Sequence, residues 1–309
     1  MPLRDLFVTA VVLGALPVII YRPVVGVLVW SWIGYMNPHR LTWGFAYDMP
    51  FAQMIAVATF IGIVFTAGKN RYIPRDALVY TLVAFNLWMV ATTLFAIYPD
   101  EAWVKLIKVI KIQVMTFVTL MLVKDRRYLH ALVWVIVVSL GFYGVKGGIF
   151  TLLTGGQYSV LGPSGTFFEG NTTVALALLM TLPLMRYLQL ESPNRWVRLG
   201  LMAAMALTAI AVLGTYSRGA LIGVAAMGVY WVWKTPYRLR FGLGAIVVAS
   251  CALVLFPQDW FQKMHSIQDY EEDQSAMGRI YAWQFTLKLV AARPITGGGF
   301  EPYTRETYN

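Results

Sequence analysis

Long apolar runs separated by short polar segments dominate this chain. Several runs approach the roughly 20 residues that a helix needs to cross the hydrocarbon of a bilayer. Strands of a membrane barrel would instead alternate in polarity, which these runs do not. The runs occupy residues 6–20, 24–36, 51–67, 77–97, 102–123, 129–145, 172–188, 197–214, 221–233 and 241–256. The pattern predicts an all-α, polytopic transmembrane helical bundle with about nine or ten membrane helices.

Proline and glycine mark where these runs should end. Tyr21-Arg22-Pro23 separates the first two runs, and we expect a tight hairpin because proline ends a helix and keeps the preceding residue out of the α region. Lys146-Gly147-Gly148 is expected to end the sixth run and to open a glycine-rich loop that continues to Asn171. Pro99-Asp100-Glu101 is expected to form a short loop before the fifth run.

The last part of the chain differs from the rest. Residues 1–256 are predicted to form the membrane domain, and the more polar residues 257–309 the first part of a large outer loop. Within this loop, the pattern from Arg279 to Val290 predicts an amphipathic helix, which Pro294 and the glycines after it should stop. Because no further apolar run precedes Asn309, we expect the chain to be cut short within this loop.

Charge gives the orientation of the runs. The 309 residues are 58% hydrophobic and 13% charged, and the net charge is +10. Three basic residues fall in each of the loops after the third, fifth, seventh and ninth runs, which places those loops in the cytoplasm and the others outside. The N-terminus would be outside if the first hairpin crosses twice and inside if it is re-entrant. The basic residues thus indicate topology and argue against a nucleic-acid partner.

One arginine stands at an outer membrane edge, where arginine is disfavoured unless a ligand requires it. It belongs to Ser217-Arg218-Gly219, between the eighth and ninth runs. A guanidinium forms two parallel hydrogen bonds with a phosphate, and Gly219 would let a ligand approach the backbone. The alternative is a simple hairpin turn whose arginine reaches to the interface.

Other charged residues are candidates for contacting the substrates, each with a structural alternative. Arg279 is a second candidate catalytic residue, unless it is only an exposed charge on an amphipathic helix. Among the remaining candidates, Arg293 could instead cap its helix, the lysines of the fifth run could extend to the interface, and Glu169 could be an ordinary loop carboxylate. These candidate substrate-binding residues are Arg293, Lys108, Lys111, Lys146 and Glu169, of which Glu169 could orient an acceptor. The histidines lack partners at metal-ligand spacing, and the glycine pairs follow no strand, as a nucleotide-binding motif would.

Three sequence features together resemble the O-antigen ligase family and its O-antigen polymerase relatives. They are Ser217-Arg218-Gly219, the pair Arg279 and Trp283, and Arg293-Pro294 before a run of glycines. Further segments look like the subgroup of O-glycosylation ligases associated with exosortase A systems. Those segments are Met36–Phe45, Gly141–Gly148 and Tyr270–Asp273.

The resemblance implies a multi-pass glycosyltransferase of the bacterial inner membrane. It would transfer a glycan from undecaprenyl diphosphate to a hydroxyl of a lipid or protein acceptor on the periplasmic side, without a nucleotide or metal cofactor. Arg218 and Arg279 would grip the diphosphate. The family's acceptor-activating histidine would lie beyond Asn309, and His265 does not match it because it precedes Arg279. An O-antigen polymerase, a transporter of lipid-linked glycans and a non-catalytic scaffold remain alternatives.

Overall fold

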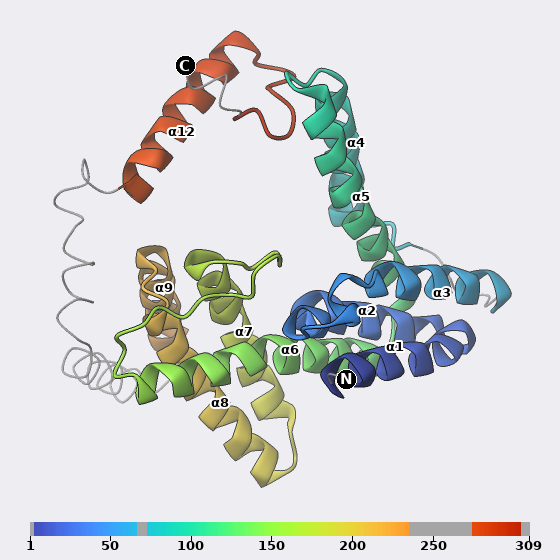
Figure 1. Cartoon of the computed structure of the whole chain (residues 1–309), viewed down its shortest axis with the longest axis vertical. Helices are drawn as coiled ribbons and strands as arrows, with labels where there is room; N and C mark the ends of the chain where they lie inside the picture. Colours follow the sequence, from blue (N-terminus) through green and yellow to red (C-terminus); the bar gives the residue numbers. More distant parts are fainter. Residues whose placement is uncertain (1–2, 67–72, 235–273, 304–309) are drawn as a thin grey trace. The chain divides into compact units, whose positions relative to one another are not determined.

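The computed structural model describes residues 3–66, 73–234 and 274–303, and helices dominate them (Figure 1). No β-strand forms in these ranges, which confirms the predicted all-α class. The helices are α1 (Leu3–Tyr21), α2 (Pro23–Met36), α3 (Phe51–Phe65), α4 (Ala77–Leu94), α5 (Pro99–Leu122), α6 (Arg126–Leu153), α7 (Asn171–Glu191), α8 (Arg195–Gly214), α9 (Arg218–Lys234) and α12 (Gln274–Ala292). Two short 3₁₀ helices, η1 (Pro38–Leu41) and η2 (Phe45–Asp48), lie between α2 and α3.

Five of the described helices are long and apolar enough to cross a membrane: α1, α4, α6, α7 and α8. The protein is therefore a multi-pass membrane protein. Three other predicted membrane helices are shorter, with 14 residues in α2, 15 in α3 and 17 in α9. The predicted run at 102–123 lies in α5, which has 24 residues but is not apolar enough to count among the five. The predicted run at 241–256 lies outside the described residues.

The chain divides into two compact units, each described by itself below. The first unit comprises residues 1–63 and 126–266, and the second comprises residues 64–125 and 267–309. The boundary predicted between residues 256 and 257 lies outside the described residues and stays a prediction.

In the first unit, α1, α2 and α3 pack through glycines. Arg22 alone separates α1 from α2, so the predicted tight hairpin is confirmed. A Cβ added at Gly26 of α2 would lie 2.9 Å from Ile19 Cγ2, and one at Gly62 of α3 would lie 2.7 Å from the Ile19 carbonyl oxygen. Ile19 is fully buried in the core that these helices share. Small residues thus let the three backbones approach closely, as is usual between membrane helices.

The packing of α6 against α8 corrects one prediction. Helix α6 does not end at Lys146-Gly147-Gly148 but continues to Leu153. A Cβ at Gly148 would lie 2.7 Å from the Leu207 carbonyl carbon, and one at Gly144 would lie 2.8 Å from Thr208 Cγ2. The glycines therefore serve close helix packing and do not break the helix. Lys146 accordingly lies on a helix and not in an outer loop.

In the second unit, the segment after α12 docks on the turn between α4 and α5. The Ile97 amide donates to the Gly298 carbonyl at 3.0 Å, and Arg293 Nη1 donates to the Phe95 carbonyl at 3.1 Å. Lys105 Nζ lies 2.6 Å from Glu301 Oε1, an ion pair between α5 and this segment. The predicted helix and its end are confirmed, because α12 ends at Ala292, directly before Arg293-Pro294.

The start of α5 corrects a second prediction. Pro99-Asp100-Glu101 forms the first turn of this helix and not a loop. Proline suits the first helical position, where no backbone N–H is needed, and carboxylates are favourable near the positive end of the helix dipole.

Candidate functional site

The candidate site is built on the turn between α8 and α9. Thr215, Tyr216 and Ser217 connect the two helices, and all three are buried. Tyr216 adopts a left-handed backbone conformation with φ 57°, which reverses the chain within this short link. The Ser217 hydroxyl accepts a hydrogen bond from the Ala220 amide at 3.3 Å and so caps the start of α9.

The loop between α6 and α7 holds this turn in place. The Tyr216 hydroxyl donates to the Gly156 carbonyl, and the Ser159 hydroxyl donates to the Thr215 carbonyl at 3.0 Å. The Val160 amide donates to the Gly214 carbonyl at 2.8 Å. The base of the Arg218 side chain is therefore part of a braced structure and not of a loose hairpin.

Arg218 is the first residue of α9, and its side chain is half-buried. Sequence analysis placed it in the link, and the structure places it at the helix N-terminus. The helix dipole at that end favours an anion, as does the guanidinium. The backbone beside it is open, since a Cβ at Gly219 would meet only Ser217 Oγ, at 4.0 Å, among the described atoms. This arrangement can bind a phosphate group.

Glu169, a predicted substrate-binding residue, has a role inside its own loop. Its Oε2 accepts a hydrogen bond from the Gly165 amide at 2.9 Å. A bridge from the Gly162 amide to the Gly170 carbonyl at 3.1 Å closes the same loop. The Glu169 side chain is exposed, so its predicted contact with an acceptor stays a prediction.

Arg40 is a cation at this loop that sequence reasoning did not select. Its guanidinium carbon lies 4.5 Å from the Tyr47 ring centroid, and its Nη1 lies 3.7 Å from Asp48 Oδ1. It also lies 3.9 Å from the position that a Cβ of Gly165 would take. The segment Asn37-Pro38-His39-Arg40 in a predicted outer loop could have indicated it.

His39, next to Arg40, lies in the same loop, between α2 and α3. Its Nδ1 is buried without a hydrogen-bond partner in the described structure. Burial, and secondarily the charge of Arg40, lower the pKa of His39 below its ordinary value of 6.5. His39 is therefore neutral at pH 7, and the positive charge of this loop belongs to Arg40.

Three of the loops that the charge pattern places on one side meet within the first unit. The Tyr143 hydroxyl of α6 donates to the Met36 carbonyl at the end of α2, and the Tyr143 ring lies 5.5 Å from the Phe168 ring. Together with the contacts of Arg40 and Tyr216, this joins residues 37–50, 154–170 and 215–217 into one rim, here called the outer rim.

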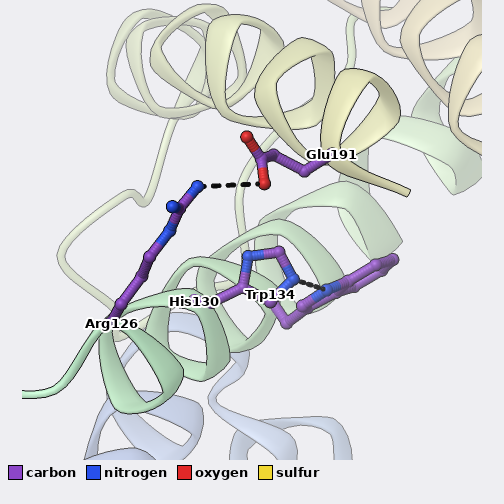
Figure 2. A network of polar contacts seen from close by, with 4 residues as sticks. All are labelled: Arg126, His130, Trp134 and Glu191. Carbon is purple, nitrogen blue, oxygen red and sulfur yellow. Dashed lines mark hydrogen bonds and ion pairs between the residues drawn. The ribbon is translucent and has the colours of Figure 1, made fainter. Parts of the chain in front are cut away.

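The opposite ends of α6 and α7 meet at a separate polar cluster (Figure 2). Arg126 Nη2 lies 3.2 Å from Glu191 Oε2, and the Trp134 indole N–H donates to His130 Nε2 at 3.1 Å. Residues 126–127 and 191–195, both predicted to be cytoplasmic, thus belong to the same end of the first unit.

The remaining predicted site residues lie elsewhere. Lys146 is exposed on α6 and lines an apolar groove described below. Lys108 and Lys111 are exposed on α5, and Arg279 is exposed on α12. Arg293 binds the Phe95 carbonyl, so it caps α4 and not its own helix. Arg218 belongs to the first unit and Arg279 to the second, and their action on one diphosphate stays a prediction.

Fold and site together define an α-helical, multi-pass membrane protein with an arginine-bearing turn between two of its helices. The chain belongs to a family of unknown function (DUF5935), whose model matches residues 3–192. Residues 203–309 match the family described as O-Antigen ligase, and the Arg218 turn lies within this match. This second match supports the O-antigen ligase superfamily, a group of membrane glycan ligases and polymerases. Searches of curated proteins and of solved structures found no match.

Proposed function

We propose that this protein is a glycan ligase of the bacterial inner membrane. It transfers an oligo- or polysaccharide from undecaprenyl diphosphate to a hydroxyl of a lipid or protein acceptor on the periplasmic side. The observation that carries the proposal is the braced turn in the O-Antigen ligase match, where Arg218 and the open backbone at Gly219 meet the N-terminus of α9. Membership of the exosortase-associated subgroup is part of the proposal.

The reaction needs little covalent chemistry from the protein. The acceptor hydroxyl oxygen attacks the anomeric carbon of the donor, and the bond from that carbon to the diphosphate oxygen breaks. The hydroxyl proton passes to a base, and undecaprenyl diphosphate leaves with the electron pair of the broken bond. The negative charge that develops on the leaving oxygen is stabilised by fixed cations at a site with little water.

Arg218 supplies such a cation at the level where the carrier's diphosphate meets the membrane edge. Its planar guanidinium forms two parallel hydrogen bonds with one phosphate, which an ammonium group does not. Arg279 is proposed as the second such cation. Lys108, Lys111 and Arg293 are proposed to guide the substrate, and Glu169 the acceptor. The reaction as proposed uses neither nucleotide nor metal, because the diphosphate already activates the sugar.

The test is glycan transfer in membranes that contain the protein, a lipid-linked glycan and an acceptor. Arg218→Ala is expected to lower the transfer rate at least about 100-fold, the usual effect of removing one group that stabilises developing charge. Arg218→Lys should retain part of the activity, because the charge remains but the paired hydrogen bonds are lost.

Arg195→Ala is the matched control. Arg195 begins α8, at the end of that helix away from the site, and its guanidinium carbon lies 5.2 Å from the Trp196 ring centroid. This variant should transfer glycan at the normal rate. Normal transfer by Arg218→Ala would reject the proposal, and products that grow by one repeat unit at a time would indicate a polymerase instead.

A further inference from the structure

An open apolar groove of about 560 Å³ runs along α6 in the first unit. Its wall on α6 is a stripe of residues three or four positions apart, from Trp134 to Ile149, which places them on one face of the helix. At about 1.5 Å per residue this stripe is roughly 22 Å long. Met185 of α7 and Leu201 and Ala204 of α8 complete the lining.

The groove has one charged group. Among the described residues that line it, Lys146 alone is charged, and its side chain is exposed about two turns before the end of α6. An ammonium group at a face turned toward lipid is costly unless it meets an anion or water. This position therefore favours a ligand with an anionic group next to an apolar chain.

Trp134 lines the groove at the other end of the stripe. Its only polar atom is already satisfied, because the indole N–H donates to His130 Nε2 at 3.1 Å (Figure 2). The His130 ring in turn packs edge-on against the Tyr187 ring of α7, with 6.1 Å between their centroids. The tryptophan therefore presents carbon to the groove, and its place on α6 is supported by α7.

The spacing of these two residues corresponds to one lipid chain. Trp134 and Lys146 are twelve positions apart, so along α6 they lie about 18 Å from each other. Half of the hydrocarbon core of a bilayer is about 15 Å thick. A chain whose headgroup lies at Lys146 would thus reach close to Trp134.

We propose that this groove binds one acyl chain of an anionic phospholipid, whose phosphate pairs with Lys146. A single ammonium group matches a single phosphate, whereas a diphosphate would be held better by several cations. Arg218, the proposed diphosphate-binding residue, is not among the groove's lining residues. The phospholipid site is therefore distinct from the proposed transfer site, and the inference does not depend on that function.

The headgroup contact is tested by the lipids retained on the purified full chain. The protein is equilibrated with vesicles of phosphatidylglycerol or of phosphatidylcholine, and bound lipid is counted by native mass spectrometry. Wild type should retain phosphatidylglycerol in preference to phosphatidylcholine. Lys146→Ala should weaken phosphatidylglycerol retention about fivefold, the effect of one lysine on an anionic lipid. Lys288→Ala, which removes the same charge from an exposed site on α12, should leave it unchanged.

The chain contact is tested by filling the groove. Ala204→Phe places a ring among the lining residues and should abolish retention of the lipid. Ala203→Phe is the matched control, because Ala203 is exposed and does not line the groove. Size-exclusion profiles show whether each variant folds, and if Ala204→Phe does not, the two lysine variants decide alone.

Two outcomes would overturn this inference. Equal retention of both phospholipids, unaffected by Lys146→Ala, would show that Lys146 selects no headgroup. Displacement of phosphatidylglycerol from the wild-type protein by undecaprenyl phosphate would assign the groove to the polyprenyl carrier instead.

Discussion

Arg218 extends from a backbone that is fixed before any ligand arrives. Thr215 and Ser217 are almost fully buried, and the Tyr216 hydroxyl forms a hydrogen bond with the loop before α7. A residue on a mobile loop would lose backbone freedom on binding, which weakens affinity. At position 218 that loss of backbone freedom is largely avoided.

Gly219 offers a test of whether a ligand approaches this backbone. Gly219→Ala should be tolerated, since the added Cβ has open space and alanine favours a helix by about 0.5–1 kcal/mol over glycine. Gly219→Leu should lower glycan transfer at least tenfold at an unchanged melting temperature, because its side chain would occupy the approach to the α9 N-terminus. Transfer rates and thermal unfolding of the two variants check this, and equal activity of both would show that no ligand passes Gly219.

At the residue scale, sequence reasoning located Arg218 but missed its surroundings. Ser217-Arg218-Gly219 stood out because it interrupts apolar runs. The contact of Arg40 with Gly165 joins two loops far apart in the sequence, and no local pattern predicts such a contact. The bond from Glu169 to the Gly165 amide depends on a turn whose glycine has φ 71°, which also emerges only from the fold.

Among the elements, α6 shows that glycines can wrongly predict the end of a membrane helix. Gly147-Gly148 next to Lys146 is typical of a loop in soluble proteins, and the sequence therefore predicted one. In this membrane protein the glycines face α8, and Gly214 of α8 likewise faces Thr151 of α6. Helix type and approximate position were predictable from hydrophobic length alone, whereas the ends of α5 and α6 required knowledge of what the helices pack against.

The α6–α8 contact predicts an unequal response to two chemically identical substitutions. Gly148→Ala should destabilise the protein by about 1–3 kcal/mol, since its Cβ would meet the Leu207 backbone, which cannot yield as a flexible side chain can. Gly200→Ala on α8 should be neutral or stabilise by up to about 1 kcal/mol, because nothing lies within 4 Å of the added carbon. Thermal unfolding in detergent measures both, and equal stability of the two variants would contradict the close packing.

For the whole molecule, the outer rim and the cluster around Arg126 and Glu191 lie at different ends of α6. The outer rim joins residues 37–50, 154–170 and 215–217, which the distribution of basic residues places on one side. In the opposite cluster, Arg126 begins α6 and Glu191 ends α7, next to loops that the same distribution assigns to the cytoplasm. The packing of the first unit is thus compatible with the orientation inferred from charge.

Cysteine labelling tests that orientation directly. Ser164 and Pro193 are both exposed and lie in the two opposite groups of loops. With Cys251 replaced by serine, Ser164→Cys should react with a membrane-impermeant maleimide added from the periplasmic side. Pro193→Cys should react only after the membrane is opened. The reverse labelling would place Arg218 in the cytoplasm and would exclude periplasmic transfer.

The close packing of α6 and α8 through their glycines also determines how chimeras of such proteins can be built. Helix α6 falls in the part of unknown function, whereas the stretch of α8 that it touches falls in the O-Antigen ligase match. The boundary between the two family matches is therefore not a boundary between independent structural domains. A chimera that joins the two parts from different relatives would pack the glycines of one α6 against the side chains of a different α8. The contacting residues of α6 and α8 must therefore be exchanged together.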